Sequence, residues 1–301
     1  MENVRPILSI CIPTNGVVEW VKPTLDSIYN QNVDYQLFEV VITDNGENSK
    51  LENILTDYSY PNLRYEKNND KGFLNLVTCL QKGEGLFCKM LNHRMMLKSG
   101  MLQEMIEVIN KYKNTKPVLY FLNGSIPYMS EFVYCKDFDQ FVYELSYWLS
   151  WSAGIGFWDI DKNKLTEIEP NEMFPNASLI FEHRQDSEYV IWNGVYGQMQ
   201  DESGKGGYDL FHTFAVVLND IVKNLYERGR ISHRTFAHTK KKIFEFLCIL
   251  YRGEVIESQS STYAFIIKDI KQSVKVHYGL NGYYWMVVRQ HLSSFKHKLF
   301  D

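Results

Sequence analysis

Along the first 125 residues, apolar positions follow two alternating patterns, which predict strands separated by helices. Near-continuous apolar runs are typical of strands buried on both faces, and they occur at residues 7–15, 38–46 and 85–91, with a further strand expected at 62–68. Between these runs, apolar residues recur at helical spacing, as at Trp20, Leu25 and Ile28. The alternation predicts an α/β fold with a doubly wound, mostly parallel sheet and right-handed crossovers.

The pattern changes after residue 116 and ends in a helical region. It predicts a strand that continues the sheet, a further strand and a hairpin-like strand pair, at residues 117–124, 150–161 and 189–199. A polar, glycine-rich break follows at 201–208, and four helices are then expected at 209–229, 232–253, 263–279 and 282–300. We expect two domains, an α/β domain over 1–207 and a helical domain over 208–301.

Polar turns follow three of the predicted strands. They are Pro13–Gly16, Asp44–Gly46 and Asn92–Arg94. Because the carboxyl ends of parallel strands share one edge of a sheet, and ligands of such sheets bind there, we expect the three turns to form one site.

The composition is that of a soluble protein. The chain has 301 residues, a net charge of −4 and five cysteines without metal-ligand spacing, which we expect to be reduced, buried thiols. The N-terminal residues lack the pattern of a signal peptide, and no apolar run reaches the about 20 residues that a membrane-spanning helix needs. We expect a cytoplasmic location, either soluble or peripheral at the inner face of the membrane, and no nucleic-acid partner.

Charge is unevenly distributed along the chain. Residues 1–222 carry 18 Lys and Arg against 30 Asp and Glu, whereas residues 223–301 carry 14 against 6. Two interpretations stay open. The basic, aromatic stretch 275–301 either meets an anionic membrane surface or packs as a basic helical face against the acidic part of the protein.

Five motifs in this order and spacing resemble the donor-binding half of family 2 glycosyltransferases with the GT-A fold. They are LSICIPTN, FEVVITDNG, YEKNNDKGFLN, KGEGLFCKMLN and LKSGML. The resemblance covers about residues 6–125 and continues weakly toward the C-terminus, where the chain is similar to the bacterial branch that decorates surface polysaccharides such as capsule or lipopolysaccharide. The enzymes of that branch are abequosyltransferase-like.

The resemblance implies a binding site for the donor nucleotide. It places the nucleotide at five residues of the first two turns, Pro13, Thr14, Asn15, Asp44 and Asn45. Gly72 and Asn75 match a further family pattern, in which Asp70 here replaces the usual Asn. The alternative for Asp44 to Gly46 is ordinary turn chemistry, and for Gly72 a tight turn at a helix start.

The third turn departs from the family pattern. Alignment places Asn92, His93 and Arg94 where relatives carry the Asp-x-Asp motif that holds a divalent cation. Mn²⁺ and Mg²⁺ prefer carboxylate oxygens, whereas Asn92 offers one neutral oxygen and Arg94 repels a cation. We therefore expect no metal or other cofactor and infer that Arg94 replaces the metal by binding the diphosphate. Two alternatives stay open, a lost active site and an ordinary surface charge.

A catalytic base and a lid complete the predicted site. An inverting transfer needs a base that takes the acceptor hydroxyl proton, and the nearest carboxylates are Asp159 as first choice and Glu172 as second. For both, a solvated surface charge is the alternative. Lys205, in the glycine-rich break, is expected in a mobile lid where it meets a phosphate, and a plain linker is the alternative.

These features predict a glycosyltransferase, hexosyl or related. It uses a nucleotide-diphosphate-sugar donor and a bacterial surface glycan or lipid-linked acceptor. The rival prediction is a catalytically degenerate GT-A protein that binds or scaffolds in the same pathway. A third is a transferase that moves a group other than a sugar.

Overall fold

The computed structural model divides the chain into two compact units. It describes residues 5–182, 184, 186–200, 203–257 and 262–300, with side chains as far as residue 293. The first unit comprises Met1–Phe141 and Leu149–Asp201, and the second comprises Val142–Trp148 and Glu202–Asp301. The second unit thus includes a short segment that the sequence pattern had placed in the α/β domain.

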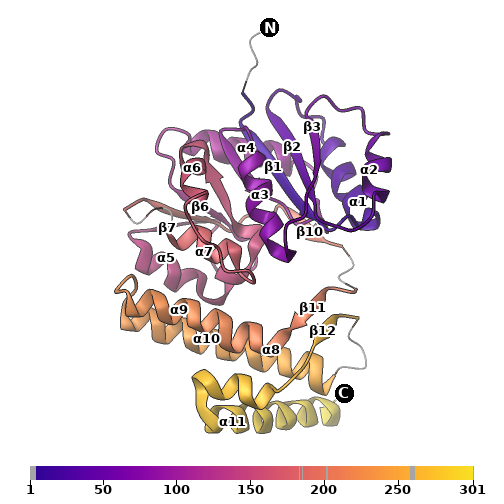
Figure 1. Ribbon diagram of the computed structural model, residues 1–301. Helices are drawn as coiled ribbons and strands as arrows, with labels where there is room; N and C mark the ends of the chain where they lie inside the picture. The colour runs from indigo at the N-terminus through magenta and orange to yellow at the C-terminus, as the bar shows by residue number, and fades with distance from the viewer. Residues whose placement is uncertain (1–4, 183, 185, 201–202, 258–261, 301) are drawn as a thin grey trace. The chain divides into compact units, whose positions relative to one another are not determined.

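A five-stranded sheet forms the centre of the first unit (Figure 1). Its order is β3-β2-β1-β4-β8, with the first four strands parallel and β8 antiparallel to β4. The strands are β1 (Leu8–Thr14), β2 (Phe38–Asp44), β3 (Leu63–Lys67), β4 (Phe87–Met90) and β8 (Gly156–Trp158). Every residue of β2 and β4 is buried, as their continuous apolar character predicts.

Helices cover both faces of this sheet. The connecting helices of the first unit are α1 (Val18–Tyr29), α2 (Lys50–Leu55), α3 (Asn75–Lys82), α4 (Met101–Tyr112), α6 (Lys162–Leu165) and α7 (Pro175–Glu182). Alternate residues of β1 and β2 pack with α1, α2 and α4 in one core cluster. The other residues of these strands face α3, where Sγ of Cys79 lies 3.4 Å from the carbonyl oxygen of Val41. The predicted α/β fold with a mostly parallel sheet is confirmed.

Two smaller sheets complete the first unit and correct two expectations. A three-stranded sheet has the order β6-β9-β7, and a two-stranded ribbon pairs β5 with β10. Their bounds are β5 (Met95–Leu97), β6 (Val118–Phe121), β7 (Phe132–Cys135), β9 (Tyr189–Trp192) and β10 (Gly197–Met199). The strand predicted at 117–124 therefore does not continue the main sheet. The predicted hairpin at 189–199 is wrong, because its two strands pair with different partners.

The second unit is mainly helical, as predicted. Its elements after residue 202 are β11 (Gly206–Asp209), α8 (Leu210–His212), α9 (Leu218–Glu227), α10 (His233–Tyr251), β12 (Ala264–Ile266) and α11 (Ile270–Phe300). Helix α5 (Phe138–Leu145) begins in the first unit and ends in the second. Strands β11 and β12 pair in parallel, so the glycine-rich break contains a strand, and the helix predicted at 263–279 begins only at Ile270.

Candidate functional site

Three strand-end turns meet at the carboxyl edge of the five-stranded sheet, as expected from the parallel strands. The backbone N–H of Asn45, after β2, donates to the carbonyl oxygen of Thr14 at the end of β1, at 3.0 Å. Oγ1 of Thr14 lies 2.7 Å from Nδ1 of His93, in the turn after β4, and accepts from the N–H of Gly16 at 3.1 Å. The edge therefore presents polar groups from all three turns side by side.

Asp44 is fully buried beneath this edge and is held from three sides. Its Oδ1 accepts from the N–H of Gly46 at 2.7 Å, while Oδ2 accepts from Tyr65 at 2.9 Å and from Nζ of Lys67 at 3.1 Å. A Cβ at Gly46 would come 2.1 Å from the carbonyl oxygen of Asn15, so this close turn requires glycine. Asp44 thus fixes the second turn, and because its carboxylate is fully buried in this arrangement, the predicted role of Asp44 at the nucleotide stays a prediction.

The loop after β3 is tied to the same edge by Asn75. Nδ2 of this buried side chain donates to the carbonyl oxygens of Thr14 and Thr43 at 3.0 and 2.9 Å, and Oδ1 accepts from Asn68 at 2.8 Å. All of these partners lie within the protein. Asn75 therefore positions the ends of β1 and β2 and leaves no side-chain atom for a ligand in this arrangement.

Gly72 and Asn45 hold the outer part of that loop. Gly72 has φ +53°, the left-handed conformation that suits the tight turn before α3. Nδ2 of Asn45 donates to the carbonyl oxygens of Asp70 and Gly72, both at 2.9 Å. Of the predicted nucleotide-binding residues in the first unit, Asn15 and Gly72 are exposed, whereas Pro13, Asn45 and Asn92 are partly accessible. These five residues offer the accessible polar or backbone groups of the predicted set in the first unit.

The donor set of the Asn92–Arg94 turn does not suit a divalent cation. Oδ1 of Asn92 accepts from the N–H of Arg94 at 2.9 Å, so the one neutral oxygen of the turn is engaged. The Arg94 side chain is 6% exposed, and its Cζ lies 3.2 Å from the ring centroid of Trp20 in α1. No group of three or more His, Cys, Asp or Glu that could hold a metal occurs within the described part of the chain. Arg94 is a fixed positive charge at the base of this turn.

The side chain of His93 points toward the end of β1, and no role was predicted for this residue. Because Oγ1 of Thr14 already accepts from Gly16, we assign the hydroxyl hydrogen to Nδ1 of His93, which places the ring proton on Nε2. Nε2 has no hydrogen-bond partner among the described residues. Although the residue is partly accessible, desolvation of its ring by the surrounding protein lowers the pKa of His93, and the charge of Arg94 lowers it further, to about 3. The neutral ring is thus an open donor at the edge.

The buried side chain of Lys89 hydrogen-bonds to the backbone just before the Asn92–Arg94 turn. Lys89 in β4 is completely buried, and its Nζ donates to the carbonyl oxygens of Met90, at 2.6 Å, and of Ala153. It also lies 4.8 and 5.2 Å from the ring centroids of Phe121 and Tyr196. Burial lowers the pKa of Lys89 to about 7. The contacts connect the end of β4 to the loop before β8.

The prediction that Asp159 is the catalytic base does not fit its position. Strand β8 runs antiparallel to β4, and Trp158 pairs with Phe87 at the amino end of β4, so Asp159 lies at the opposite edge of the sheet. There it pairs with Arg5 at 2.6 Å and with Lys116 at 2.7 Å. Burial acts to raise the pKa of Asp159, but the hydrogen bonds from Lys116 and Arg5 outweigh it and lower the pKa below its ordinary value. Asp159 is a structural ion-pair partner.

Glu172, the second candidate base, lies on the carboxyl side. Its Oε2 is 2.6 Å from Nζ of Lys71, and both side chains are exposed. Lys71 directly precedes Gly72, which Asn45 holds against the end of β2. The pair thus places Glu172 beside the predicted nucleotide site, with its carboxylate accessible to an acceptor.

Lys205 belongs to the second unit. Its carbonyl oxygen accepts from the N–H of Ala264 at 2.8 Å, directly before the pairing of β11 with β12. The segment 203–207 is thus attached to β12 through its backbone. A role of Lys205 in a lid stays a prediction.

Two residues of the site were missed as functional, each for an identifiable reason. His93 was aligned with the middle position of the Asp-x-Asp motif, but that motif was assessed only for its ability to bind a metal. Trp20 was noted only for the apolar spacing of a helix, whereas its ring contacts both Arg94 and His93, the latter at a centroid distance of 5.3 Å. The signal that could have drawn attention to His93 is its position in a polar turn directly after a buried strand.

Comparisons with known proteins agree with the fold. Residues 9–114 match the family model described as Glycosyl transferase family 2. The chain is similar to the crystal structure of S. aureus TarS 1–349, with a TM-score of 0.57 and 15% identity over 84% of this chain and 76% of that one. The structure of the same protein with UDP-GlcNAc matches with a TM-score of 0.55 and 15% identity over 84% of this chain and 76% of that one. The structure with UDP matches with a TM-score of 0.54 and 16% identity over 81% of this chain and 71% of that one.

A search of curated proteins finds no significant match. The abequosyltransferase-like assignment stays a prediction. The predicted GT-A fold is confirmed, and residues 9–114 carry the sequence pattern of the family 2 glycosyltransferases.

Proposed function

We propose that the chain is a glycosyltransferase that transfers a sugar, hexosyl or related, from a nucleotide-diphosphate-sugar donor. The observation that carries the proposal is the meeting of the three strand-end turns, joined by Thr14, Asn45 and His93, at the edge where α/β sheets bind ligands. The match of residues 9–114 and the binding of UDP and UDP-GlcNAc by TarS support a nucleotide sugar as donor.

The proposed mechanism uses protein charge at the diphosphate. Arg94 supplies a fixed positive charge, and Nε2–H of His93 donates a hydrogen bond to a phosphate oxygen, so the leaving group is stabilised without a metal. Trp20 fixes the guanidinium of Arg94 by stacking. Because no carboxylate lies in the turn, we derive no step through a divalent cation.

For the acceptor half, we propose an inverting displacement with Glu172 as base. Its exposed carboxylate takes the proton of the acceptor hydroxyl while that oxygen attacks the anomeric carbon and the nucleoside diphosphate leaves. The acceptor is proposed to be a bacterial surface glycan or a lipid-linked glycan, and the protein a cytoplasmic one at the inner face of the membrane. The contact of residues 275–301 with an anionic membrane depends on a separate surface, that of α11.

A panel of nucleotide sugars tests the donor. The melting temperature of the protein is measured with UDP-GlcNAc, other UDP, GDP, CDP and dTDP sugars, each with Mn²⁺ and with EDTA. A donor present at about 100 times its dissociation constant adds about 2.7 kcal/mol to the free energy of unfolding, which gives a clear rise in melting temperature. We expect one donor to give this rise equally with Mn²⁺ and with EDTA. No rise with any donor would refute the proposal.

Turnover separates the enzyme from its rival, a degenerate protein that binds or scaffolds. Release of nucleoside diphosphate on addition of acceptor, unchanged by EDTA, is expected of the enzyme, whereas donor binding without release is expected of the binder. Glu172→Gln should lower the turnover number about 10²- to 10⁴-fold and leave donor affinity unchanged. Lys71→Gln, which removes only the partner of Glu172, is the matched control.

A further inference from the structure

We infer that one face of α11 docks on the surface of an anionic lipid bilayer, which is a property beyond the proposed transfer reaction. The side chains of Tyr284, Trp285, Val288 and Leu292 are between 49% and 60% exposed. Together with Arg289 and Ser293 they line a shallow groove of about 620 Å³. Large apolar side chains gathered on one exposed face of a soluble protein mark an interaction site.

The face follows from the periodicity of the helix. Residues 284, 288 and 292 recur at four-residue spacing, and Trp285 lies beside them. On the opposite side of the helix, Met286 is fully buried and Gln290 is 8% exposed. Helix α11 therefore uses one side to pack within the second unit and leaves an apolar side uncovered.

Cations accompany both aromatic rings of this face. Nζ of Lys271 donates to the hydroxyl oxygen of Tyr284 at 3.2 Å and lies 5.4 Å from its ring centroid. Cζ of Arg289 lies 4.6 Å from the ring centroid of Trp285. Each aromatic side chain of this face therefore has a positive charge beside it, at the hydroxyl of Tyr284 and over the ring of Trp285, and aromatic residues next to cations are typical of helices that lie at a membrane interface.

The charge of the whole helix favours a lipid surface over a second copy of the protein. The sequence of residues 270–300 contains five Lys and Arg but no Asp or Glu. Two α11 faces brought together would therefore place cations against cations, and neither helix offers a carboxylate to pair with them. Anionic headgroups complement the cations, and the apolar side chains enter the boundary between headgroups and acyl chains.

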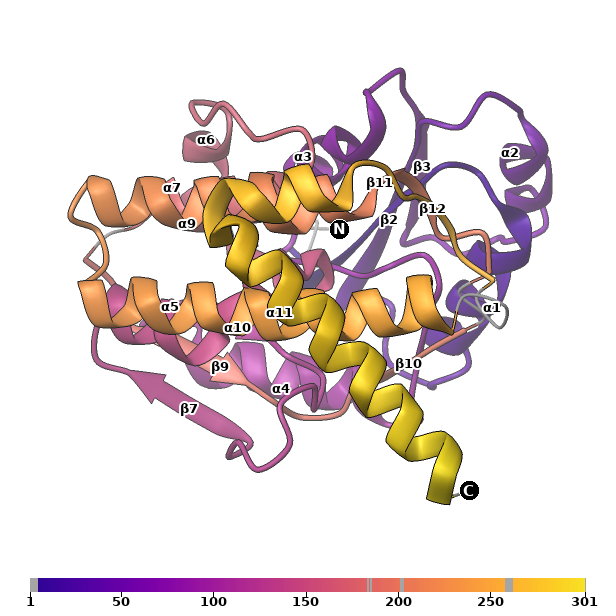
Figure 2. The ribbon, with the colours of Figure 1, turned by 90° about the horizontal axis from the view of Figure 1, so that it is seen from below.

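The geometry suits a helix that lies in the plane of the membrane. Among the described residues, no helix combines the length and the apolar character needed to cross a bilayer. Gly279, with φ +68° and ψ 175°, interrupts α11, and Figure 2 shows the bend that results. The bend separates the first segment of α11, which carries Lys271, from the longer segment that carries the apolar face.

Vesicle flotation with the complete chain tests the inference without donor or acceptor. We expect binding to vesicles of phosphatidylcholine with about 30% phosphatidylglycerol, and little binding to phosphatidylcholine alone, in about 0.1 M salt. Val288→Asp and Leu292→Asp should each weaken binding about tenfold, because each removes an exposed apolar side chain that the bilayer would bury on docking. Arg289→Gln should weaken it about fivefold.

A matched variant controls for nonspecific effects. Ile160→Asp replaces an apolar residue that is 55% exposed, compared with 56% for Val288, in the first unit. It should leave vesicle binding unchanged, and melting curves confirm that each variant is folded. Equal binding of Val288→Asp and the wild type, or no preference for anionic vesicles, would overturn the inference. Self-association that Val288→Asp abolishes, without vesicle binding, would identify a second copy as the occupant. Each of these results leaves the proposed transferase activity untouched.

Discussion

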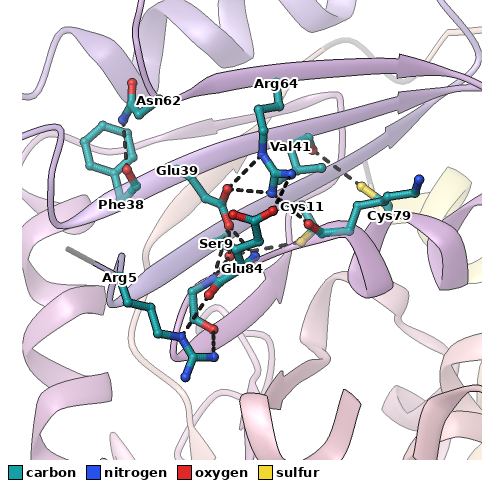
Figure 3. A network of polar contacts seen from close by, with 12 residues as sticks. Arg5, Ser9, Cys11, Phe38, Glu39, Val41, Asn62, Arg64, Cys79 and Glu84 are labelled. Atoms are coloured by element: carbon teal, nitrogen blue, oxygen red, sulfur yellow. Dashed lines mark hydrogen bonds and ion pairs between the residues drawn. The ribbon is translucent and has the colours of Figure 1, made fainter. Parts of the chain in front are cut away.

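Strand β2 carries a buried carboxylate at each end, and the surroundings of the two differ. Glu39, at the amino end, is 5% exposed, and its Oε1 accepts from Ser9 and from the N–H of Glu84, both at 2.5 Å. Its Oε2 accepts from Nη2 and Nε of Arg64 at 2.7 and 3.0 Å, in the network that Figure 3 shows. Arg5 closes the edge by donating to the carbonyl oxygens of Glu84 and Gly85.

At the carboxyl end of β2, both carboxylate oxygens of Asp44 accept hydrogen bonds, as those of Glu39 do, but some neighbouring polar groups have no such partner in the described part of the chain. Asn15 is exposed, and Nε2 of His93 has no partner among the described residues. At the amino edge, Glu39, Ser9, Arg64 and Arg5 pair within the protein, although the buried Oδ1 of Asn62 has no partner among the described residues. Because both ends of β2 carry a buried, paired carboxylate, the carboxylates do not distinguish the two edges, whereas the exposed Asn15 and Nε2 of His93, unpartnered among the described residues, do.

The largest expected effect is a loss of stability when the network around Glu39 at the amino edge is broken. Glu39→Ala leaves the hydroxyl of Ser9 and the N–H of Glu84 without their acceptor and removes the carboxylate partner of Nε and Nη2 of Arg64. The free energy of unfolding should therefore fall by about 3–5 kcal/mol, measured by urea denaturation. Glu84→Ala, which removes an exposed partner of Arg64, should cost less than about 1 kcal/mol. Donor affinity of the folded protein should not change. A loss of affinity without loss of stability in Glu39→Ala would remove the distinction between the two edges.

The second effect is on the open edge. Arg94→Ala should lower the transfer rate about 10²- to 10³-fold in EDTA, because it removes the charge that stabilises the leaving group. Arg94→Lys keeps the charge but loses the flat stacking on Trp20, and it should retain an intermediate rate. An unchanged rate in folded Arg94→Ala would rule out the replacement of a metal by this residue.

A smaller effect is expected at His93. His93→Ala should weaken binding of the nucleoside diphosphate about tenfold, by loss of one hydrogen bond to a charged group, as measured by calorimetry. Because the folded pKa is about 3, the ring is already neutral at pH 5, and His93 should contribute no change in affinity between pH 5 and pH 8. A step near pH 6.5 that is absent from His93→Gln would contradict this.

The smallest effect is expected at Asp159. Asp159→Asn should leave the transfer rate within about twofold, since the residue lies at the amino edge, and should cost about 1 kcal/mol of stability. Its folded pKa is lowered, so this contribution is present above the ordinary pKa of Asp and is lost as the pH falls through the folded value. Acid unfolding of wild type and variant should therefore converge at low pH. A large loss of kcat would restore Asp159 as a candidate base.

Sequence patterns were sufficient for the main sheet and for the meeting of the three turns. Continuous apolar runs identify strands buried on both faces, and parallel strands bring their ends together wherever the chain crosses over. They were insufficient for β8 and β9, because a short apolar strand gives no information about its partner. The antiparallel direction of β8 alone moves Asp159 to the wrong edge for catalysis.

Roles within the site were harder to predict than its position. Thr14, Asp44 and Asn75 were expected at the nucleotide, but their side chains pair mainly within the protein. Hydrogen bonds between segments far apart in sequence decide which atoms of a polar residue stay available to a ligand. Local sequence patterns do not predict these hydrogen bonds. His93 is open for the same reason, because one nitrogen finds Thr14 and the other finds no described residue.

The two nitrogens of His93 therefore respond to different events. A change at Nδ1 should report disturbance of the contact with Thr14, whereas in the proposed mechanism a change at Nε2 should report binding of the donor diphosphate. With ¹⁵N-labelled histidine, magnetic resonance can follow occupancy and strand-end integrity in one spectrum, using a probe that the protein itself provides.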